Sequence, residues 1–303
     1  MGEVLLWATI YLATMLLGYA LKRLGIFKKD DRKFLSDVIF YITLPAMLVS
    51  SFTGVTVDLW FLIAMLLGFG TNALMVATAL FASRKKTPEL QALYVLNGSG
   101  LNLGNITMPF LRNFYATGIP YICMFDIGDS FFTLGTTNAI ACTRLGRGVD
   151  GSWVKNIVVS LGKSVPFDTY LIMTLLALLH IQLPDALLTA ADFIGRGNGF
   201  LAMLLVGLSL EFNLSRKDLG ELLGLVAVRY GCATLAAFVI WFLIPAPLLM
   251  RKVLALSVFS ASPNVALIYS TRLGIRTEIV SALAPVTTLL MIPIMSVLMI
   301  LMG

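Results

Sequence analysis

Charged residues and cysteines are scarce in this sequence, and each shortage excludes a class of protein. Asp, Glu, Lys and Arg make up 13% of the 303 residues, hydrophobic residues make up 58%, and the mean hydropathy is +0.91. So few charges cannot cover a soluble domain of this size. Cys123, Cys142 and Cys232 lie in apolar stretches without paired spacing, which argues against a disulfide framework and a zinc site. We expect an all-α integral membrane protein that has no cofactor and is not an enzyme.

Hydrophobic runs long enough to cross a bilayer recur along the whole chain. We expect ten of them, at residues 4–21, 34–53, 59–82, 89–111, 119–143, 165–183, 190–212, 219–244, 251–271 and 278–302. Residues 144–164, between the fifth and sixth runs, have the pattern of a linker that carries a short amphipathic helix on the membrane surface. No basic stretch precedes the first run, so we expect it to remain as a helix rather than to be a cleaved signal.

Lysine and arginine are concentrated in every second connection between the runs. Seventeen of the 22 basic residues fall in the odd-numbered connections, four fall in the even-numbered ones, and Arg229 lies inside the eighth run. Cytoplasmic loops carry an excess of Lys and Arg, so the odd-numbered connections and the linker are predicted to be cytoplasmic. Both termini are then extracytoplasmic in a multi-pass protein of the cell membrane. The net charge of +6 reflects this asymmetry and contact with lipid, not nucleic-acid binding.

The ten runs divide into two sets of five, at residues 1–143 and 165–303. Because five is odd, the two halves have opposite orientations in the membrane, which is the geometry of an inverted repeat. Residues 45–48 and 201–204 share Ala-Met-Leu at an offset of 156, and Pro109 and Pro263 are separated by 154 residues. The agreement of these offsets predicts that the fourth and ninth runs are structural equivalents.

Both of these runs are interrupted by small, amide-bearing and helix-breaking residues, at 99–109 and 260–264. Proline removes an amide donor, and freed backbone groups inside a membrane must be satisfied by protein, water or a ligand. Interrupted segments at matching places point to a substrate site at the middle of the membrane. Asn102 and Asn105 supply donors and acceptors there. The alternative is that the glycines and amides only allow two helices to pack closely.

One face of the fifth run carries a polar stripe at helical spacing. It consists of Asp126, Asp129, Ser130, Thr133 and Thr137. A carboxylate inside a membrane is costly and indicates a proton relay or a cation ligand, so Asp126 and Asp129 are candidates for coupling to H⁺ or Na⁺. The alternatives are that both lie near an interface, or that they pair with Arg229 or Arg112 to hold the helices together.

The second run contains Pro45, followed by Ser50 and Ser51. A proline there kinks the helix and can direct the two hydroxyl groups toward a cavity. Close packing explains the same residues equally well.

Several of these segments together resemble the auxin efflux carrier family, the bacterial type within the superfamily of bile acid, arsenite and riboflavin transporters. The resemblance covers nearly all 303 residues. Its most specific parts are Asn102 seven residues before Pro109, and the segment 261–264 with its continuation through 270–274 into the tenth run. Leu44-Pro45 is similar as well. The chain lacks the long central cytoplasmic loop of the plant members.

The resemblance implies two inverted five-helix repeats whose broken fourth and ninth helices cross at the membrane centre. Helices 1, 2, 6 and 7 would form a scaffold and a possible homodimer contact, and helices 3–5 and 8–10 a transport domain that moves like an elevator. The substrate would be a small organic anion, a carboxylate or auxin-like weak acid. The residues implied as substrate contacts are Asn102, Pro109 and Pro263, with Asn105, Asn264 and Ser51 as lesser candidates.

Two other functions are compatible with parts of the sequence. A membrane sensor would bind the same ligand without moving it. An intramembrane aspartyl protease is suggested by Asp126-Ile127-Gly128-Asp129, but such catalysis needs two carboxylates that converge from different helices, and these two share one helix.

Overall fold

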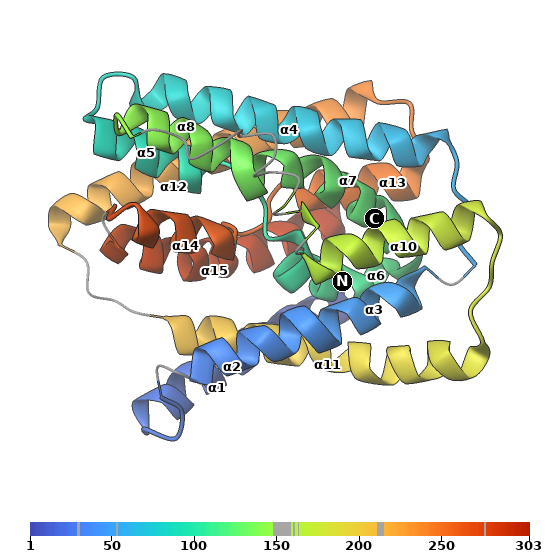
Figure 1. The fold of residues 1–303 in the computed structure, drawn as a ribbon. Coiled ribbons are helices and arrows are strands. Elements are labelled where there is room, and N and C mark those ends of the chain that lie inside the picture. The colour runs from blue at the N-terminus through green and yellow to red at the C-terminus, as the bar shows by residue number, and fades with distance from the viewer. Residues whose placement is uncertain are drawn as a thin grey trace.

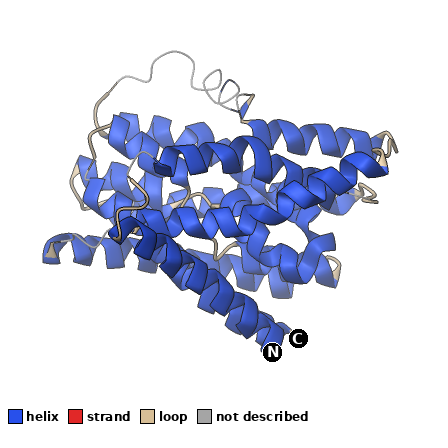
Figure 2. Cartoon of the chain, turned by 90° about the horizontal axis from the view of Figure 1, so that it is seen from below, coloured by secondary structure: helices blue, strands red, loops and turns tan. Residues whose placement is uncertain are grey.

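The computed structural model describes residues 1–28, 31–52, 54–147, 159, 161–162, 164–210, 215–275 and 277–303. All regular structure in these ranges is helical (Figure 2), so the prediction of an all-α protein is confirmed. The amphipathic helix expected within residues 144–164 falls largely outside the described residues.

The first half of the chain forms eight α-helices with short π-helical and 3₁₀ turns between some of them. Their bounds are α1 Gly2–Arg23, α2 Asp31–Val38, η1 Ile39–Thr43, α3 Leu44–Ser51, α4 Leu59–Ser83, α5 Pro88–Gly98, η2 Leu103–Thr107, α6 Met108–Tyr115, η3 Ala116–Gly118, α7 Ile119–Phe131, η4 Phe132–Thr136 and α8 Thr137–Arg144. The turn η1 joins α2 to α3 and η4 joins α7 to α8 without a gap, so each pair follows one predicted hydrophobic run.

The second half of the chain repeats this pattern of long and interrupted helices. Its elements are α10 Val165–Leu178, α11 Asp185–Ser209, α12 Arg216–Phe238, η5 Val239–Leu243, α13 Leu248–Ser257, α14 Asn264–Arg272 and α15 Thr277–Met302. Among the described residues, six helical stretches are long and apolar enough to cross a membrane. They are Gly2–Arg23, Asp31–Ser51, Leu59–Ser83, Asp185–Ser209, Asp218–Leu243 and Glu278–Met302. The remaining predicted runs are built from shorter helices.

Polar side chains cap the starts of several helices and so fix where the spans begin. The Asp58 carboxylate accepts a hydrogen bond from the Trp60 N–H at 2.9 Å ahead of α4. Ser164 caps α10, and Ser215 caps α12. Each cap satisfies a backbone donor that the first turn of a helix leaves free.

Two helix pairs approach so closely that only glycine fits between their backbones. Gly18 and Gly207 face each other across α1 and α11, and Gly68 and Gly128 do the same across α4 and α7. A Cβ atom at any of the four would lie within 2.4 Å of a backbone carbonyl oxygen of the facing helix. Small residues at such crossings are typical of helix packing in membranes.

The helices pack as two groups (Figure 1). Helices α1 and α3 both pack against α11, with α10 beside α3, and helices α4, α5, α7, α8 and α12 form a second group. Helix α13 packs against α7 and α12 of the second group, and α15 contacts members of both groups. The two termini lie near each other in both views (Figures 1 and 2).

Candidate functional site

Two non-helical segments cross in the interior of the bundle. One comprises residues 99–102, between α5 and η2, and the other residues 258–263, between α13 and α14. The backbone N–H of Asn102 donates a hydrogen bond to the Ala261 carbonyl oxygen at 3.0 Å. Ala261 is completely buried, so the free backbone groups at this crossing must find partners inside the protein.

Arg229 of α12 satisfies the carbonyl groups of both segments. Its Nη2 atom donates to the carbonyl oxygens of Ser260 at 2.9 Å and Ala261 at 2.7 Å, and its Nη1 atom donates to the Ser99 carbonyl at 3.3 Å. Arg229 is only 1% exposed. A buried guanidinium that bonds three carbonyls is committed to holding the crossing together. Its Nη groups therefore bind backbone, not the carboxylates of the fifth run.

Asn72 of α4 and Asp129 of α7 satisfy the N–H groups of the first segment. The Gly100 N–H donates to Asn72 Oδ1 at 3.2 Å, and the Leu101 N–H donates to Asp129 Oδ2 at 3.3 Å. Asp129 also accepts hydrogen bonds from Asn72 Nδ2 at 2.8 Å and from Thr133 Oγ1 at 2.7 Å. Asp129 is thus fully engaged in positioning the segment.

Hydroxyl groups of threonine bond further polar groups of the second segment. The Ser262 N–H donates to Thr287 Oγ1 of α15 at 3.0 Å, and Thr107 Oγ1 donates to Ser260 Oγ at 2.7 Å. The crossing is therefore held by side chains from α4, α7, α12 and α15.

A cavity of about 480 Å³, here called the crossing cavity, lies beside the two segments. Six of the residues that the sequence singled out line it: Asn102, Asn105, Asp126, Asp129, Pro263 and Asn264. Its other walls include Tyr170 of α10 and, near one end, Ser36, Ser164 and Arg272. The volume is within the range of small-molecule sites.

Two side chains that line the crossing cavity each have a buried amide atom without a hydrogen-bond partner among the described residues. The atoms are Nδ2 of Asn102, a donor, and Oδ1 of Asn105, an acceptor. Asn102 is 5% exposed. A buried polar group without a partner costs roughly 1–3 kcal/mol, so a small rotation of either side chain toward the cavity would gain a hydrogen bond to a polar ligand.

The amino end of α14 meets the same cavity. The helix begins at Asn264, directly after Pro263, and no side chain caps it. The first N–H groups of a helix carry partial positive charge and attract anions. Together with the Asn102 amide, this end offers donors to a negative group.

The two aspartates of α7 have different surroundings. Tyr170 Oη donates to Asp126 Oδ2 at 2.7 Å, which is the hydrogen bond found at that carboxylate among the described residues. Asp129 accepts bonds from three residues. Asp126 is therefore the carboxylate with acceptor capacity left for a proton, a cation or a ligand.

Asn105 and Asn264 also border a second cavity of about 620 Å³. Its walls are mostly apolar, and Arg32 and Lys33 of α2 lie on it. The two asparagines thus line both the crossing cavity and this larger one.

Pro109 and Ser51 lie away from the crossing cavity. Pro109 is the second residue of α6, seven residues after the first non-helical segment ends, and it lines a different cavity of about 440 Å³. The interruption expected at residues 99–109 lies at residues 99–102, ahead of this proline. The break occurs at Gly100, whose φ of +72° L-residues rarely adopt. Ser51 lines a cavity of about 330 Å³ and donates to the Met47 carbonyl at 2.7 Å.

Sequence reasoning missed Asn72 and Thr287 and gave Arg229 no role at the crossing. Both missed residues are polar groups in apolar helices, a signal that the sequence contains. The backbone group that each side chain bonds is set by how helices distant in the sequence pack together. No local sequence pattern contains that information.

Comparisons with known proteins agree with this picture. Residues 7–144 match the family described as "Membrane transport protein". The chain is 26% identical over 298 residues to the "Uncharacterized transporter MJ1031" of Methanocaldococcus jannaschii, and the alignment covers 92% of each chain. These similarities confirm the predicted resemblance to the auxin efflux carrier family, and the long apolar helices agree with a multi-pass membrane protein.

Proposed function

We propose that this membrane transporter carries a small organic anion, such as a carboxylate or auxin-like weak acid, by alternating access, and that the anion binds in the crossing cavity. The observation that carries the proposal is the pair of unpartnered amide atoms, Asn102 Nδ2 and Asn105 Oδ1, beside the uncapped start of α14. A protonated or hydrated carboxyl group offers both an acceptor and a donor, and so complements this pair.

Recognition of the anion relies on dipoles more than on full charges. Arg229 already bonds three backbone carbonyls, so it is not free for a ligand. The start of α14 and the amides of Asn102 and Asn264 supply the donors at the crossing. Arg272, at the exposed end of the cavity, adds a positive charge that attracts anions into it.

The proposed moving parts are the two helix groups. In this proposal α1–α3, α10 and α11 form the scaffold, α4–α8 and α12–α15 form the transport domain, and residues 1–143 and 165–303 are inverted repeats. The most extensively packed helix pairs, α4 with α7 and α1 with α11, each lie within one group, which supports it, and α15 packs against both groups. Polar bonds between the groups include Tyr170–Asp126 at 2.7 Å and Tyr11 to the Pro109 carbonyl at 2.8 Å, and an elevator movement would break both. A homodimer would form through the scaffold.

The helix ends that reach the crossing cavity assign a state to the transporter in this proposal. Its lining residues include Ser36, near the start of α2, Ser164, ahead of α10, and Arg272, an exposed residue at the end of α14. The excess of basic residues in the odd-numbered connections places these helix ends at the cytoplasmic face. In this proposal the structure is an inward-facing form, with both termini on the outer face of the cell membrane.

Coupling to H⁺ or Na⁺ is assigned to Asp126 rather than shared equally with Asp129. Asp126 lines the cavity and bonds Tyr170 of the scaffold, so its protonation changes both the charge of the site and a contact between the two groups. Asp129 bonds the first non-helical segment, and its loss would disturb the site as a whole. The two carboxylates hydrogen-bond different partners within the described structure, unlike a protease dyad that shares one proton.

The experiment is flux in proteoliposomes. Purified protein is reconstituted, and uptake of a panel of labelled monocarboxylates and dicarboxylates is measured under pH, Na⁺ and voltage gradients. Saturable uptake of at least one anion supports the proposal. Folded protein that binds an anion in a thermal-shift assay, yet moves none under any gradient, supports the sensor instead.

A further inference from the structure

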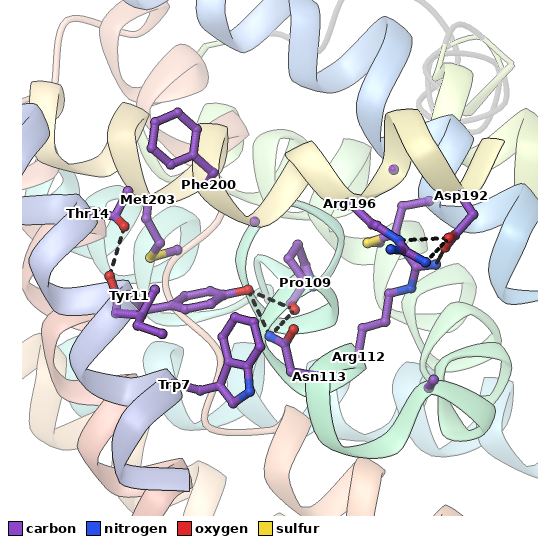
Figure 3. A pocket seen from close by; sticks show the side chains of 15 residues that line it. Trp7, Tyr11, Thr14, Pro109, Arg112, Asn113, Asp192, Arg196, Phe200 and Met203 are labelled. Carbon is purple, nitrogen blue, oxygen red and sulfur yellow. Dashed lines mark hydrogen bonds and ion pairs between the residues drawn. The ribbon is translucent and has the colours of Figure 1, made fainter. Parts of the chain in front are cut away.

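A charged cluster lines another cavity, which shares no lining residue with the crossing cavity (Figure 3). Arg112 of α6 contacts Asp192 of α11, with Nη2 to Oδ1 at 2.6 Å, and donates to Ser50 Oγ of α3 at 2.9 Å. Arg196, one turn after Asp192, contacts the other carboxylate oxygen at 2.6 Å. All three charged residues line the cavity of about 440 Å³, here called the Arg112 cavity.

This cluster has one positive charge more than it has negative charge. It holds two guanidinium groups and one carboxylate, and the other described residues that line the Arg112 cavity are uncharged. The Arg112 and Asp192 side chains are 18% and 32% exposed, so water screens them only in part. An added anion would neutralise the cluster, and arginine binds carboxylates in a planar, bidentate manner.

Asp192 has a second partner that remains if Arg112 leaves. Arg196 donates to Asp192 Oδ2 from Nε at 2.8 Å and contacts it again through Nη2. Removing one partner from an ion pair is costly when the other is buried and left alone, but here the partly exposed carboxylate keeps its pair with Arg196, a mostly exposed side chain on its own helix. Arg112 can therefore exchange one carboxylate for another at little cost.

Arg112 also joins the two helix groups. It belongs to α6, whereas Ser50 and Asp192 belong to α3 and α11. Close to it, Tyr11 Oη of α1 donates to the Pro109 carbonyl at 2.8 Å, and Asn113 Nδ2 donates to Tyr11 Oη at 3.2 Å (Figure 3). These contacts hold α6 against α1, α3 and α11.

We propose that the Arg112 cavity is a second carboxylate site, in which a ligand carboxylate displaces Asp192 from Arg112 and so frees α6 from α11. Trp7, Phe200 and Met203 line the same cavity and offer apolar contacts to the body of the ligand. The inference takes its ligand class from the proposed function, but binding here is measured without transport.

Trp7 supplies a reporter inside the cavity. The chain has four tryptophans, and Trp60→Phe, Trp153→Phe and Trp241→Phe leave Trp7 alone. Its fluorescence is titrated with trichloroacetate, a carboxylate that quenches indole on contact, and with trichloroethanol as the neutral counterpart at equal ionic strength. We expect saturable quenching by the carboxylate and linear, non-saturable quenching by the alcohol.

Two substitutions in this background move the affinity in opposite directions. Arg112→Gln removes the cation that binds the ligand, so the dissociation constant should rise about tenfold or more. Asp192→Asn removes the internal competitor, so the dissociation constant should fall about threefold to tenfold. Arg84→Gln, which removes an exposed arginine at the end of α4, is the matched control and should change nothing. Arg112→Lys, which keeps the charge, replaces Arg112→Gln if that variant does not fold.

If the Arg112–Asp192 ion pair only stabilised the fold, the quenching titration would give a different result. If Asp192→Asn weakens binding as Arg112→Gln does, or if both quenchers act alike, the second site does not exist. Asn102→Ala should leave the Trp7 titration unchanged, since Asn102 lies in the other cavity. If the Trp7 titration gives the expected result in a protein that transports no anion, the second carboxylate site stands and only the proposed function is overturned.

Discussion

The backbone N–H of Asn102 lies 3.0 Å from the carbonyl oxygen of Ala261 and donates a hydrogen bond to it. This bond joins the two breaks directly, although they belong to opposite halves of the chain. Hydrocarbon offers no partners to unpaired backbone groups, so the crossing exists only because side chains from four other helices complete it. The stability of the protein and the shape of its proposed site therefore depend on the same few residues.

Arg229→Met should be among the most damaging single substitutions. It leaves the carbonyls of Ser99, Ser260 and Ala261 without their buried donors, and hydrogen bonds to charged groups contribute about 1.5–3 kcal/mol each. We expect a loss of at least about 3 kcal/mol, measured as a large fall in the thermal unfolding midpoint in detergent. Arg251→Met, which removes an arginine outside the crossing, is the control. Equal midpoints for the two variants would contradict the role given to Arg229.

Gly100→Ala should destabilise the first non-helical segment. The residue has a φ of +72°, and a Cβ atom would lie 2.7 Å from Thr133 Oγ1. A left-handed conformation costs an L-residue about 1–2 kcal/mol, and the steric contact adds to that. Gly231→Ala on α12 has open space for its Cβ and a helical position, so it should be neutral or slightly stabilising. Unfolding midpoints of the pair test this, and a neutral Gly100→Ala would argue against the segment as described.

Substitutions at the two aspartates of α7 should separate stability from coupling. Asp129→Ala removes the acceptor of three hydrogen bonds, so the unfolding midpoint should fall. Asp126→Asn keeps its volume and one acceptor for Tyr170, so the protein should stay folded while the pH or Na⁺ dependence of flux is lost. Flux across a pH series, with midpoints recorded beside it, checks both. If Asp126→Asn transports with unchanged pH and Na⁺ dependence, Asp126 is not the coupling residue.

The sequence predicted the helical class, the hydrophobic runs and several of the polar residues that line the crossing cavity. These predictions were possible because amide and carboxylate groups stand out inside apolar runs. The residues concerned also lie on one face of a helix or in one interrupted segment. The sequence placed the first break within residues 99–109, and the structure narrows it to residues 99–102, around Gly100 rather than Pro109. Proline is tolerated near the start of α6, while the positive φ that interrupts the chain is available to any glycine, and the fourth run contains several.

The side chains that hydrogen-bond the backbone of the two non-helical segments could not be predicted in the same way. Arg229 reaches backbone carbonyls in both halves, and Asn72 reaches the N–H of Gly100 across a helix contact. Such bonds depend on how helices cross, and periodicity within one helix carries no information about that. The Arg112–Asp192 pair is a further example, since its members are 80 positions apart.

The affinity of Asn102→Ala for transported anion tests the central claim most directly. The amide at this position has an unpartnered donor on the crossing cavity, and one hydrogen bond to a charged ligand corresponds to roughly a tenfold or greater change in affinity. The half-saturation concentration for flux of the best carboxylate in the panel should rise about tenfold or more in Asn102→Ala. It should stay unchanged in Asn138→Ala, an amide on α8 outside the crossing cavity. Equal half-saturation concentrations in Asn102→Ala and the unaltered protein, both folded and active, would contradict a substrate site at the crossing.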